Sequence, residues 1–272
     1  MNSDNGTFWD HLDVLRSALI RSIIVVTIAS IVVFLLKDIV FEDIIFAATK
    51  SDFPTFRALE QITKILGLNS QLKVEPVKII NTQLAAQLFI HLSVSFYLGL
   101  TISIPYITGE FWHFIKPALY QNEKTTAFKA VVFMGILFYI GVLVNYFLIF
   151  PLSVNFLSAY KVMESIDNLI DIDSYIDTFV SMSLSMGIVF ELPAAAYFLA
   201  KIEILKSTFL KKYRRHAFVL ILTAAAMITP TTDIFTMLLV AAPLQLLYEI
   251  SVKIVKNVET KNKTSISPTN QV

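Results

Sequence analysis

The chain has 272 residues, of which 56% are hydrophobic and only 16% are charged. A soluble domain of this length could not bury so much apolar surface, since much of its exterior must face water, so the composition predicts a polytopic membrane protein. A net charge of +1 gives no indication of a polyanionic partner such as nucleic acid, and the absence of cysteine excludes disulfides, cysteine nucleophiles and thiolate metal sites.

Six segments are candidates for membrane-spanning helices, which need about 20 apolar residues to cross the hydrocarbon layer. In chain order they are residues 17–36, 84–107, 130–150, 179–200, 217–228 and 234–255. The fifth is short for a bilayer of ordinary thickness, so we expect local thinning or a protecting neighbour there. Only a polar turn separates it from the sixth, so the two should form an antiparallel hairpin. The pattern predicts an all-α integral membrane protein with a single polytopic domain over residues 1–272.

Capping signals and prolines predict where these helices begin and end. Thr7–Asp10 has the form of a capping box before the first span, and Ser174–Asp177 has it before the fourth. Proline removes a backbone donor and disfavours helix in the preceding residue. Span ends are therefore expected near Pro105, Pro151 and Pro230. Pro243 lies inside the sixth span, where it predicts a kink.

Two segments outside the spans have their own patterns. In the long connection over residues 38–80, apolar side chains recur at near-helical spacing: Phe56, Leu59, Ile62 and Leu66. This spacing predicts an amphipathic helix in the outer membrane interface, forming a cap. The polar tail over residues 257–272, rich in Lys, Asn, Thr and Ser, is predicted to be disordered.

Basic residues predict the orientation, because cytoplasmic loops carry an excess of Lys and Arg. The loop between the fourth and fifth spans holds six: Lys201, Lys206, Lys211, Lys212, Arg214 and Arg215. The loop between the third and fourth spans has Lys161 as its one basic residue among several acids, which is typical of an outer loop. The long segment 37–78 is an exception, because it carries several basic residues although it is predicted to lie outside. The balance predicts that both termini are cytoplasmic.

Motifs of enzymes are missing from the sequence. It contains no phosphate-binding glycine loop, no His-Glu-x-x-His pair and no Gly-x-Ser-x-Gly elbow. The four histidines are scattered near predicted span ends, where a wetted polar residue is the ordinary interpretation. We therefore expect no catalysis, no metal and no cofactor.

Glu191 is the most unusual acid, because it lies in the middle of the fourth span. A carboxylate at that depth costs at least about 2–3 kcal/mol and usually faces a cavity or a partner. The preceding residues Ser181, Ser183 and Ser185 could form the polar wall of such a recess. The alternative is a protonated glutamate that is hydrogen-bonded to a neighbouring helix.

Other acids allow ordinary interpretations. Glu123 lies in a predicted inner loop, where an acid is normally solvated, and Asp13 and Arg16 have the spacing of an ion pair on one helix. Asp233 follows the Thr-Pro turn and is predicted to cap the sixth helix. Glu249 lies deep in the sixth span, and its position alone indicates no role.

A series of motifs resembles, in order, those of the TatC family, the multi-span subunit of twin-arginine protein translocases. The motifs are His11–Arg16, Phe111–Tyr120 with Glu123, Phe138–Gly141, Tyr146–Phe147, Phe150–Leu152, Phe190–Pro193, Thr229–Pro230 with Asp233, and Pro243 with Tyr248–Ile250. Together they cover residues 11–250 and are highly specific.

The resemblance implies a concave bundle with short fifth and sixth helices in the bacterial cytoplasmic (inner) membrane. It implies a receptor that binds signal peptides with consecutive arginines on folded cargo. The receptor would work in an oligomeric complex with TatA-type and TatB-type single-span subunits, in contact with membrane lipid. Export would be powered by the proton-motive force, without nucleotide.

The family's functional positions can be carried over to this chain. Its loop glutamate falls on Glu123 and its loop aromatic residue on Phe114, while its intramembrane glutamate falls on Glu191 and its outer aspartate on Asp233. Glu249 is a secondary candidate.

Neighbouring residues complete the predicted signal-peptide site, which also includes Asp13, Arg16 and Lys124. The family's N-terminal glutamate position is Val14 here, with an acid displaced to Asp13. Adjacent residues on a helix point about 100° apart, so Asp13 reaches a different direction from the family's glutamate.

Two other classes of membrane protein are alternatives for a chain of this composition. A proton-coupled small-solute transporter could use Glu191 as its proton site, but such carriers usually show paired repeats and broken helices, which are not evident here. An intramembrane protease would need a nucleophile and a base, and the sequence offers no such pair.

Overall fold

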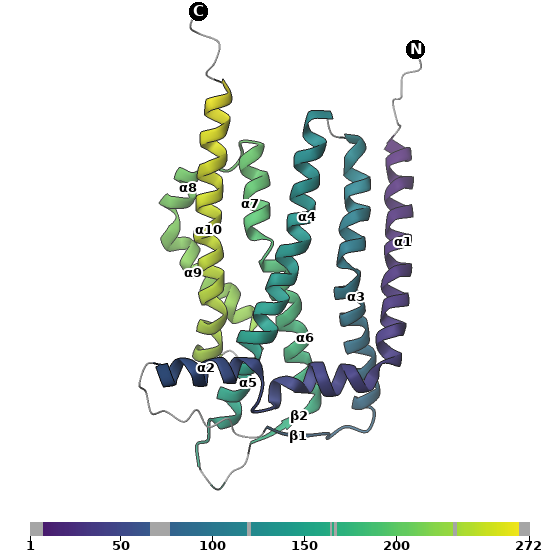
Figure 1. The fold of residues 1–272 in the computed structure, drawn as a ribbon, viewed down its shortest axis with the longest axis vertical. Helices are drawn as coiled ribbons and strands as arrows, with labels where there is room; N and C mark the ends of the chain where they lie inside the picture. Colours follow the sequence, from purple (N-terminus) through teal and green to yellow (C-terminus); the bar gives the residue numbers. More distant parts are fainter. Residues whose placement is uncertain are drawn as a thin grey trace, which may run out of the picture. The chain divides into compact units, whose positions relative to one another are not determined.

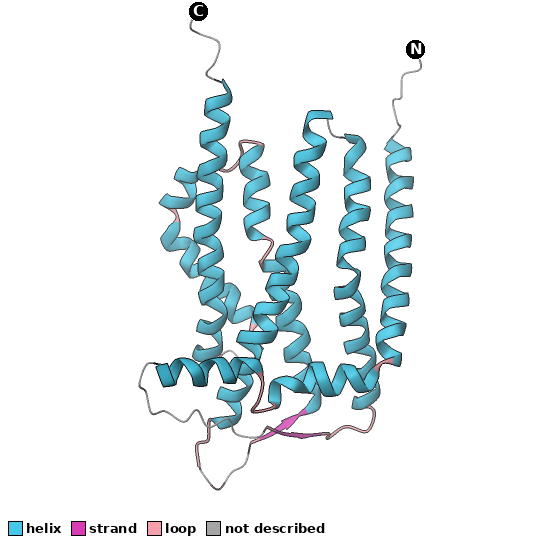
Figure 2. Ribbon diagram, viewed as in Figure 1, coloured by secondary structure: helices cyan, strands magenta, loops and turns pink. Residues whose placement is uncertain are grey.

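The computed structural model of the chain describes residues 8–65, 77–118, 121–163, 165, 168–230 and 233–266. Helices dominate this part of the chain, and its strands are two short segments (Figure 1 and Figure 2). The chain divides into two compact units. The smaller unit comprises Met1–Phe46 and Asn81–Ile136, and the larger unit comprises Ala47–Ile80 and Leu137–Val272.

Two long helices, α1 (Phe8–Leu35) and α3 (Ala86–Ile115), form the body of the smaller unit and pack along each other (Figure 1). They have 28 and 30 residues. At about 1.5 Å per residue each exceeds the roughly 30 Å of hydrocarbon that a span must cross. The π-helical η1 (Ile39–Ile45) follows α1, and the 3₁₀ turn η3 (Lys116–Ala118) follows α3. The helix α4 (Gln121–Val144) begins in this unit.

The larger unit holds the remaining elements. In chain order they are η2 (Phe46–Thr49), α2 (Pro54–Ile65), β1 (Lys78–Ile80), η4 (Asn145–Ile149), α5 (Phe150–Ala159), β2 (Leu169–Asp171), α6 (Ile172–Val189), α7 (Leu192–Lys201), α8 (Ser207–Lys212), α9 (Arg214–Ile228) and α10 (Ile234–Ile266). The two strands pair in parallel, with Lys78 opposite Leu169 and Ile80 opposite Asp171.

The core of the larger unit lies among η4, α6, α9 and α10. Met182, Met186, Ala225, Val240 and Leu244 are buried there in one apolar cluster. A Cβ at Gly141 would lie 2.5 Å from the carbonyl oxygen of Met186, and a Cβ at Gly187 would lie 2.6 Å from the Phe138 ring. Glycine at both positions therefore lets the backbones of α4 and α6 approach closely.

Five helical stretches among the described residues are long and apolar enough to cross a membrane. They are Leu12–Leu35, Ala86–Phe114, Phe128–Ala159, Ile172–Lys201 and Ile234–Lys261. The fifth predicted span corresponds to α9, which has 15 residues. The protein is a multi-pass membrane protein, and its count of six spans stays a prediction.

Several predicted helix ends are wrong. The fourth span does not begin after a box at Ser174; α6 starts at Ile172, with the Asp171 carboxylate accepting a hydrogen bond from the Asp173 N–H group at 3.0 Å. Pro105 lies inside α3, and Pro151 lies in the first turn of α5, directly after η4. A helix that ended within lipid would expose several unpaired backbone groups. Continuing the helix through a proline loses only one backbone donor, so it costs less free energy than ending the helix there.

Other expectations agree with the structure. The helix α9 ends at Ile228, shortly before Pro230. Pro243 lies inside α10, and the kink expected there stays a prediction. The Thr7 end of the first predicted box and Leu66 lie outside the described residues. The predicted amphipathic helix is present as α2, where Phe56 is buried; Phe53, just before it, packs on Tyr146 with ring centroids 5.6 Å apart.

The predicted disordered tail is helical in its first part. The helix α10 has 33 residues and continues to Ile266, so the expectation of a short sixth helix that ends near residue 255 is wrong. Val255 and Val258 are buried against Ala196 and Ala200, so the apolar stripe of the sixth span continues beyond the membrane-spanning length. Packing on α7 explains why a polar composition did not prevent helix formation.

Candidate functional site

The predicted signal-peptide residues lie on three helix ends of the smaller unit. Asp13 and Arg16 are exposed in the first turns of α1, and Phe114 is half-buried in the last turn of α3. Glu123 and Lys124 lie in the first turn of α4; the Glu123 side chain is outside the described part of the structure. These helix ends lie at the same end of the unit (Figure 1). The fold therefore brings together segments that are about a hundred residues apart in sequence.

The predicted ion pair between Asp13 and Arg16 is wrong. The structure places no oxygen of Asp13 within ion-pair distance of an Arg16 nitrogen, and both side chains are exposed. A surface pair three residues apart gains only a few tenths of a kcal/mol, which the loss of side-chain freedom offsets. Asp13 is thus not neutralised by Arg16.

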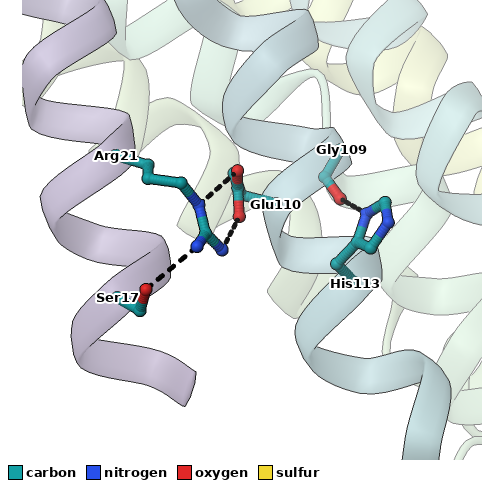
Figure 3. Close-up of polar contacts among 5 residues, drawn as sticks. All are labelled: Ser17, Arg21, Gly109, Glu110 and His113. Carbon is teal, nitrogen blue, oxygen red and sulfur yellow. Dashed lines mark hydrogen bonds and ion pairs between the residues drawn. The ribbon is translucent and has the colours of Figure 1, made fainter. Parts of the chain in front are cut away.

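An ion pair that was not predicted lies further along the same helices. Arg21 of α1 donates to both oxygens of Glu110 in α3, from Nε at 2.9 Å and from Nη2 at 2.7 Å (Figure 3). The Arg21 Nη1 group also donates to Ser17 Oγ at 2.9 Å. The Glu110 side chain is 14% exposed and that of Arg21 is 49% exposed. This fork-to-fork geometry fixes the register of α1 against α3.

One signal in the sequence could have indicated that Arg21 has a partner, although not which residue it is. Arg21 lies within the first predicted span, residues 17–36, and a charged side chain in such a place needs a partner. Glu110 lies one turn before Phe114, and His113 beside it has its Nδ1 atom 3.1 Å from the Gly109 carbonyl oxygen (Figure 3).

Glu191 lies at a break between two helices of the larger unit. The helix α6 ends at Val189, and α7 begins at Leu192 with Pro193 in its first turn. Because Pro193 has no N–H group, the helical hydrogen bond back to Val189 cannot form. Glu191 donates its own N–H group to the Ile188 carbonyl oxygen at 3.1 Å and accepts from Ala195 at 2.9 Å. The fourth span is therefore interrupted at its acid.

The Glu191 carboxyl group is half-buried, and its Oε2 atom is buried without a hydrogen-bond partner in the described part of the chain. This atom therefore gives no support to the alternative, in which a protonated Glu191 is hydrogen-bonded to a neighbouring helix. An unpaired carboxyl oxygen in low-dielectric surroundings is unfavourable, and a donor brought by another helix would relieve it.

The predicted polar wall of serines is wrong. Ser183 is buried and accepts a hydrogen bond from Asn145 Nδ2 at 2.7 Å, whereas Ser181 is exposed and Ser185 is half-buried. Residues two apart on a helix point about 200° away from each other, so a stripe of alternate serines cannot line one surface.

Two further acids have defined partners. Asp233 caps α10, where its Oδ1 atom accepts a hydrogen bond from the Thr236 N–H group at 2.7 Å, as predicted. Glu249 of α10 forms an ion pair with Arg214 of α9 at 2.7 Å, which gives it the role that its position alone did not indicate. Within the described residues, no group of three or more His, Cys, Asp or Glu side chains could hold a metal ion.

Comparison with known proteins adds independent findings. The family model described as Sec-independent protein translocase protein (TatC) matches residues 10–243. The chain is 37% identical over 250 residues to the Sec-independent protein translocase protein TatC of Blattabacterium sp. subsp. Periplaneta americana (strain BPLAN), covering 91% of this chain and 94% of that protein. It is 33% identical over 253 residues to the TatC protein of Campylobacter jejuni subsp. jejuni serotype O:2, and the match covers 93% of this chain and 95% of that protein.

A solved structure is similar as well. The crystal structure of a twin-arginine translocase receptor, TatC, superposes with a TM-score of 0.65 at 31% sequence identity. The match covers 92% of this chain and 99% of that chain, so it extends over both units.

Proposed function

The chain belongs to the TatC family and is a component of a Sec-independent protein translocase, and we propose that it is the subunit that receives twin-arginine signal peptides of folded cargo. The family is one of translocase components and not of known enzymes. The matching crystal structure is described as that of a twin-arginine translocase receptor, which supports the same role for this chain.

The observation that carries the proposal is the position of three helix ends that bear the predicted peptide-site residues. Asp13 on α1, Phe114 on α3 and Glu123 on α4 lie at one end of the smaller unit (Figure 1). A pair of guanidinium groups is held best by carboxylates in bidentate geometry, and an aromatic face can stack on guanidinium or on an apolar residue. Glu123 is the proposed principal carboxylate, with Asp13, Arg16, Phe114 and Lys124 around it.

Crosslinking tests this site directly. A photoreactive amino acid at Lys124 should crosslink to a peptide with two consecutive arginines, and a matched peptide with two lysines should crosslink less, because lysine cannot bind a carboxylate bidentately. Glu123→Gln should lower capture of the arginine peptide. Glu60→Gln, which removes an exposed acid from α2, is the control and should leave capture unchanged. Unchanged capture by Glu123→Gln would overturn the assignment.

We further propose that Glu191 offers a polar contact to a visiting helix, either the apolar part of the signal peptide or a TatA-type subunit. Support comes from the helix break and from the buried Oε2 atom without a partner in the described residues. Glu191→Gln keeps a hydrogen-bonding side chain, whereas Glu191→Leu removes it. Export should therefore fall more in the leucine variant, and export at the wild-type rate in that variant would refute the proposal.

The proposal includes an orientation, with both termini on the cytoplasmic side of a bacterial inner membrane. Because the chain contains no cysteine, single cysteines can be introduced and labelled without interference. A cysteine at Lys124 should react with a membrane-impermeant maleimide only in inverted vesicles, and one at Arg57 of α2 only in intact cells. The reverse pattern would contradict the orientation and the peptide site together.

We also propose that the chain acts in an oligomeric complex with TatA-type and TatB-type single-span subunits and that the proton-motive force drives export. Family membership supports both points. Co-purification of tagged chain with such subunits, and loss of export on adding a protonophore while ATP is maintained, are the measurements that check them.

A further inference from the structure

A short elbow joins α7 to α9 and contains α8; it comprises residues 202–213. A carboxylate of α10 fixes it in place: Glu259 accepts from the Ser207 N–H group at 2.8 Å and from Ser207 Oγ at 2.5 Å. Leu205 and Leu210 pack inward, on the apolar cluster of α7 and α10 that includes Val255. The elbow is therefore a preformed part of the larger unit and not a loose loop.

The outer face of the elbow combines apolar and cationic side chains around one depression. A cavity of about 330 Å³ is lined by Ile204, Lys206, Thr208, Phe209 and Lys212. Ile204 is 70% exposed and Phe209 is 54% exposed, whereas Leu205 and Leu210 of the same segment are partly buried. Two ammonium groups and one hydroxyl group are thus next to uncovered apolar surface.

The chain segment that lines this cavity is rich in basic residues. Between residues 201 and 215 the chain has six basic residues and a single acid, Glu203. Of the six, Arg214 is paired with Glu249 at 2.7 Å. The helix terminus does not supply an anion site, because the Ser207 N–H group already donates to Glu259. Lysine side chains and the Thr208 hydroxyl group are what remains to hold an anion.

The position in the chain indicates which anion meets these groups. The candidate span Ile172–Lys201 ends directly before the elbow, so the elbow lies where the hydrocarbon layer gives way to headgroups. Exposed apolar residues at this boundary favour acyl chains, and lysines favour phosphate. A ligand with both features is an anionic amphiphile.

We propose that the elbow binds an anionic membrane phospholipid, with its phosphate held by Lys206, Lys212 and Thr208 and an acyl chain lying on Ile204 and Phe209. The site is separate from the proposed peptide site, which lies on the smaller unit, so each can fail without the other. Bound lipid would fasten the connection between the interrupted fourth span and the short α9.

The test uses the purified full chain in detergent, titrated with phosphatidylglycerol, phosphatidylcholine or inorganic phosphate while bound lipid is counted by native mass spectrometry. Each lysine near an anionic headgroup contributes about fivefold to affinity, so K206Q/K212Q should weaken phosphatidylglycerol binding by roughly 30-fold. The control K201Q/K211Q removes the same charge from the last residue of α7 and from α8 without changing a cavity-lining residue, and it should keep most of the binding. K206R/K212R should also retain it.

Three outcomes would overturn the proposal. Equal losses in K206Q/K212Q and K201Q/K211Q would mean a diffuse electrostatic attraction and no site. Equal binding of phosphatidylcholine and phosphatidylglycerol would exclude recognition of net negative charge. Competition by inorganic phosphate as strong as that by the lipid would show that the acyl chain contributes nothing.

Discussion

Gly99 lies where α3 crosses α1, and adding a single methyl group there tests how tightly the two helices are packed. The Cβ of an alanine would lie 2.6 Å from the Ser30 amide nitrogen and 2.7 Å from its Cα, as well as against Ser30 Oγ. The hydroxyl group can rotate away, but the backbone atoms cannot, so α1 must move off α3 by roughly an ångström before ordinary contact is restored. Inserting a methyl group into such a packed contact costs about 1–3 kcal/mol.

Gly109 provides the matched control, because it is in the same helix and a Cβ there would meet nothing within 4 Å. Alanine improves helix propensity by up to about 1 kcal/mol over glycine at either position. The difference in unfolding free energy between Gly99→Ala and Gly109→Ala therefore isolates the steric cost.

Thermal unfolding in detergent, followed by tryptophan fluorescence, measures this difference. With about 2–4 °C of Tm change for each kcal/mol in a protein of this size class, Gly99→Ala should melt roughly 2–12 °C below Gly109→Ala. If the two variants melt together, α1 and α3 are not in the close contact described and the packing of the smaller unit needs another explanation.

Three further predictions concern single polar contacts. Glu110→Gln should lower the Tm by loosening α1 from α3, and the swap Arg21→Glu with Glu110→Arg should recover much of the loss; a swap that is worse than the single substitution would show that the pair does not hold the helices. Asp233→Ala should reduce the unfolding free energy by about 1 kcal/mol through loss of the α10 cap, measured by denaturant titration, while Asp233→Asn should cost much less. In α2, the hydrogen bond from Lys64 lowers the pKa of Glu60 below its usual 4.5, so the contribution of this pair is present above that pH and is lost as the pH falls through the lowered pKa. NMR titration of the Glu60 carboxyl group should show this, and Lys64→Gln should return the pKa towards its ordinary value.

Local patterns predicted those features that depend on residues close in sequence. The Asp233 cap follows from an acid three residues before the amide that it accepts from, and α2 follows from apolar residues at helical spacing. The lengths of the helices were less predictable. The proline rules derived from water-soluble helices fail in lipid, because ending a helix there costs more free energy than losing one hydrogen bond. That is why α3 passes through Pro105.

Contacts between residues that are distant in sequence could not be predicted from these local patterns. Arg21 and Glu110 are 89 residues apart, and Arg214 and Glu249 are 35 apart, so no spacing rule connects them. The helical extension of α10 beyond residue 257 likewise depends on Ala196 and Ala200 of α7. In each case the partner is supplied by packing, which composition and periodicity do not specify.

Three of the acids in the candidate spans, Glu110, Glu191 and Glu249, show how packing separates residues that look alike in the sequence. Glu110 is held bidentately by Arg21, and Glu249 is paired with Arg214, so each carboxylate has its counter-charge within its own unit. Among the described residues Glu191 forms no such ion pair, and its Oε2 atom is buried without a hydrogen bond. Since a paired carboxylate gains little from a new donor whereas an unpaired one gains a full hydrogen bond, a visiting helix with a polar side chain has most to gain at Glu191.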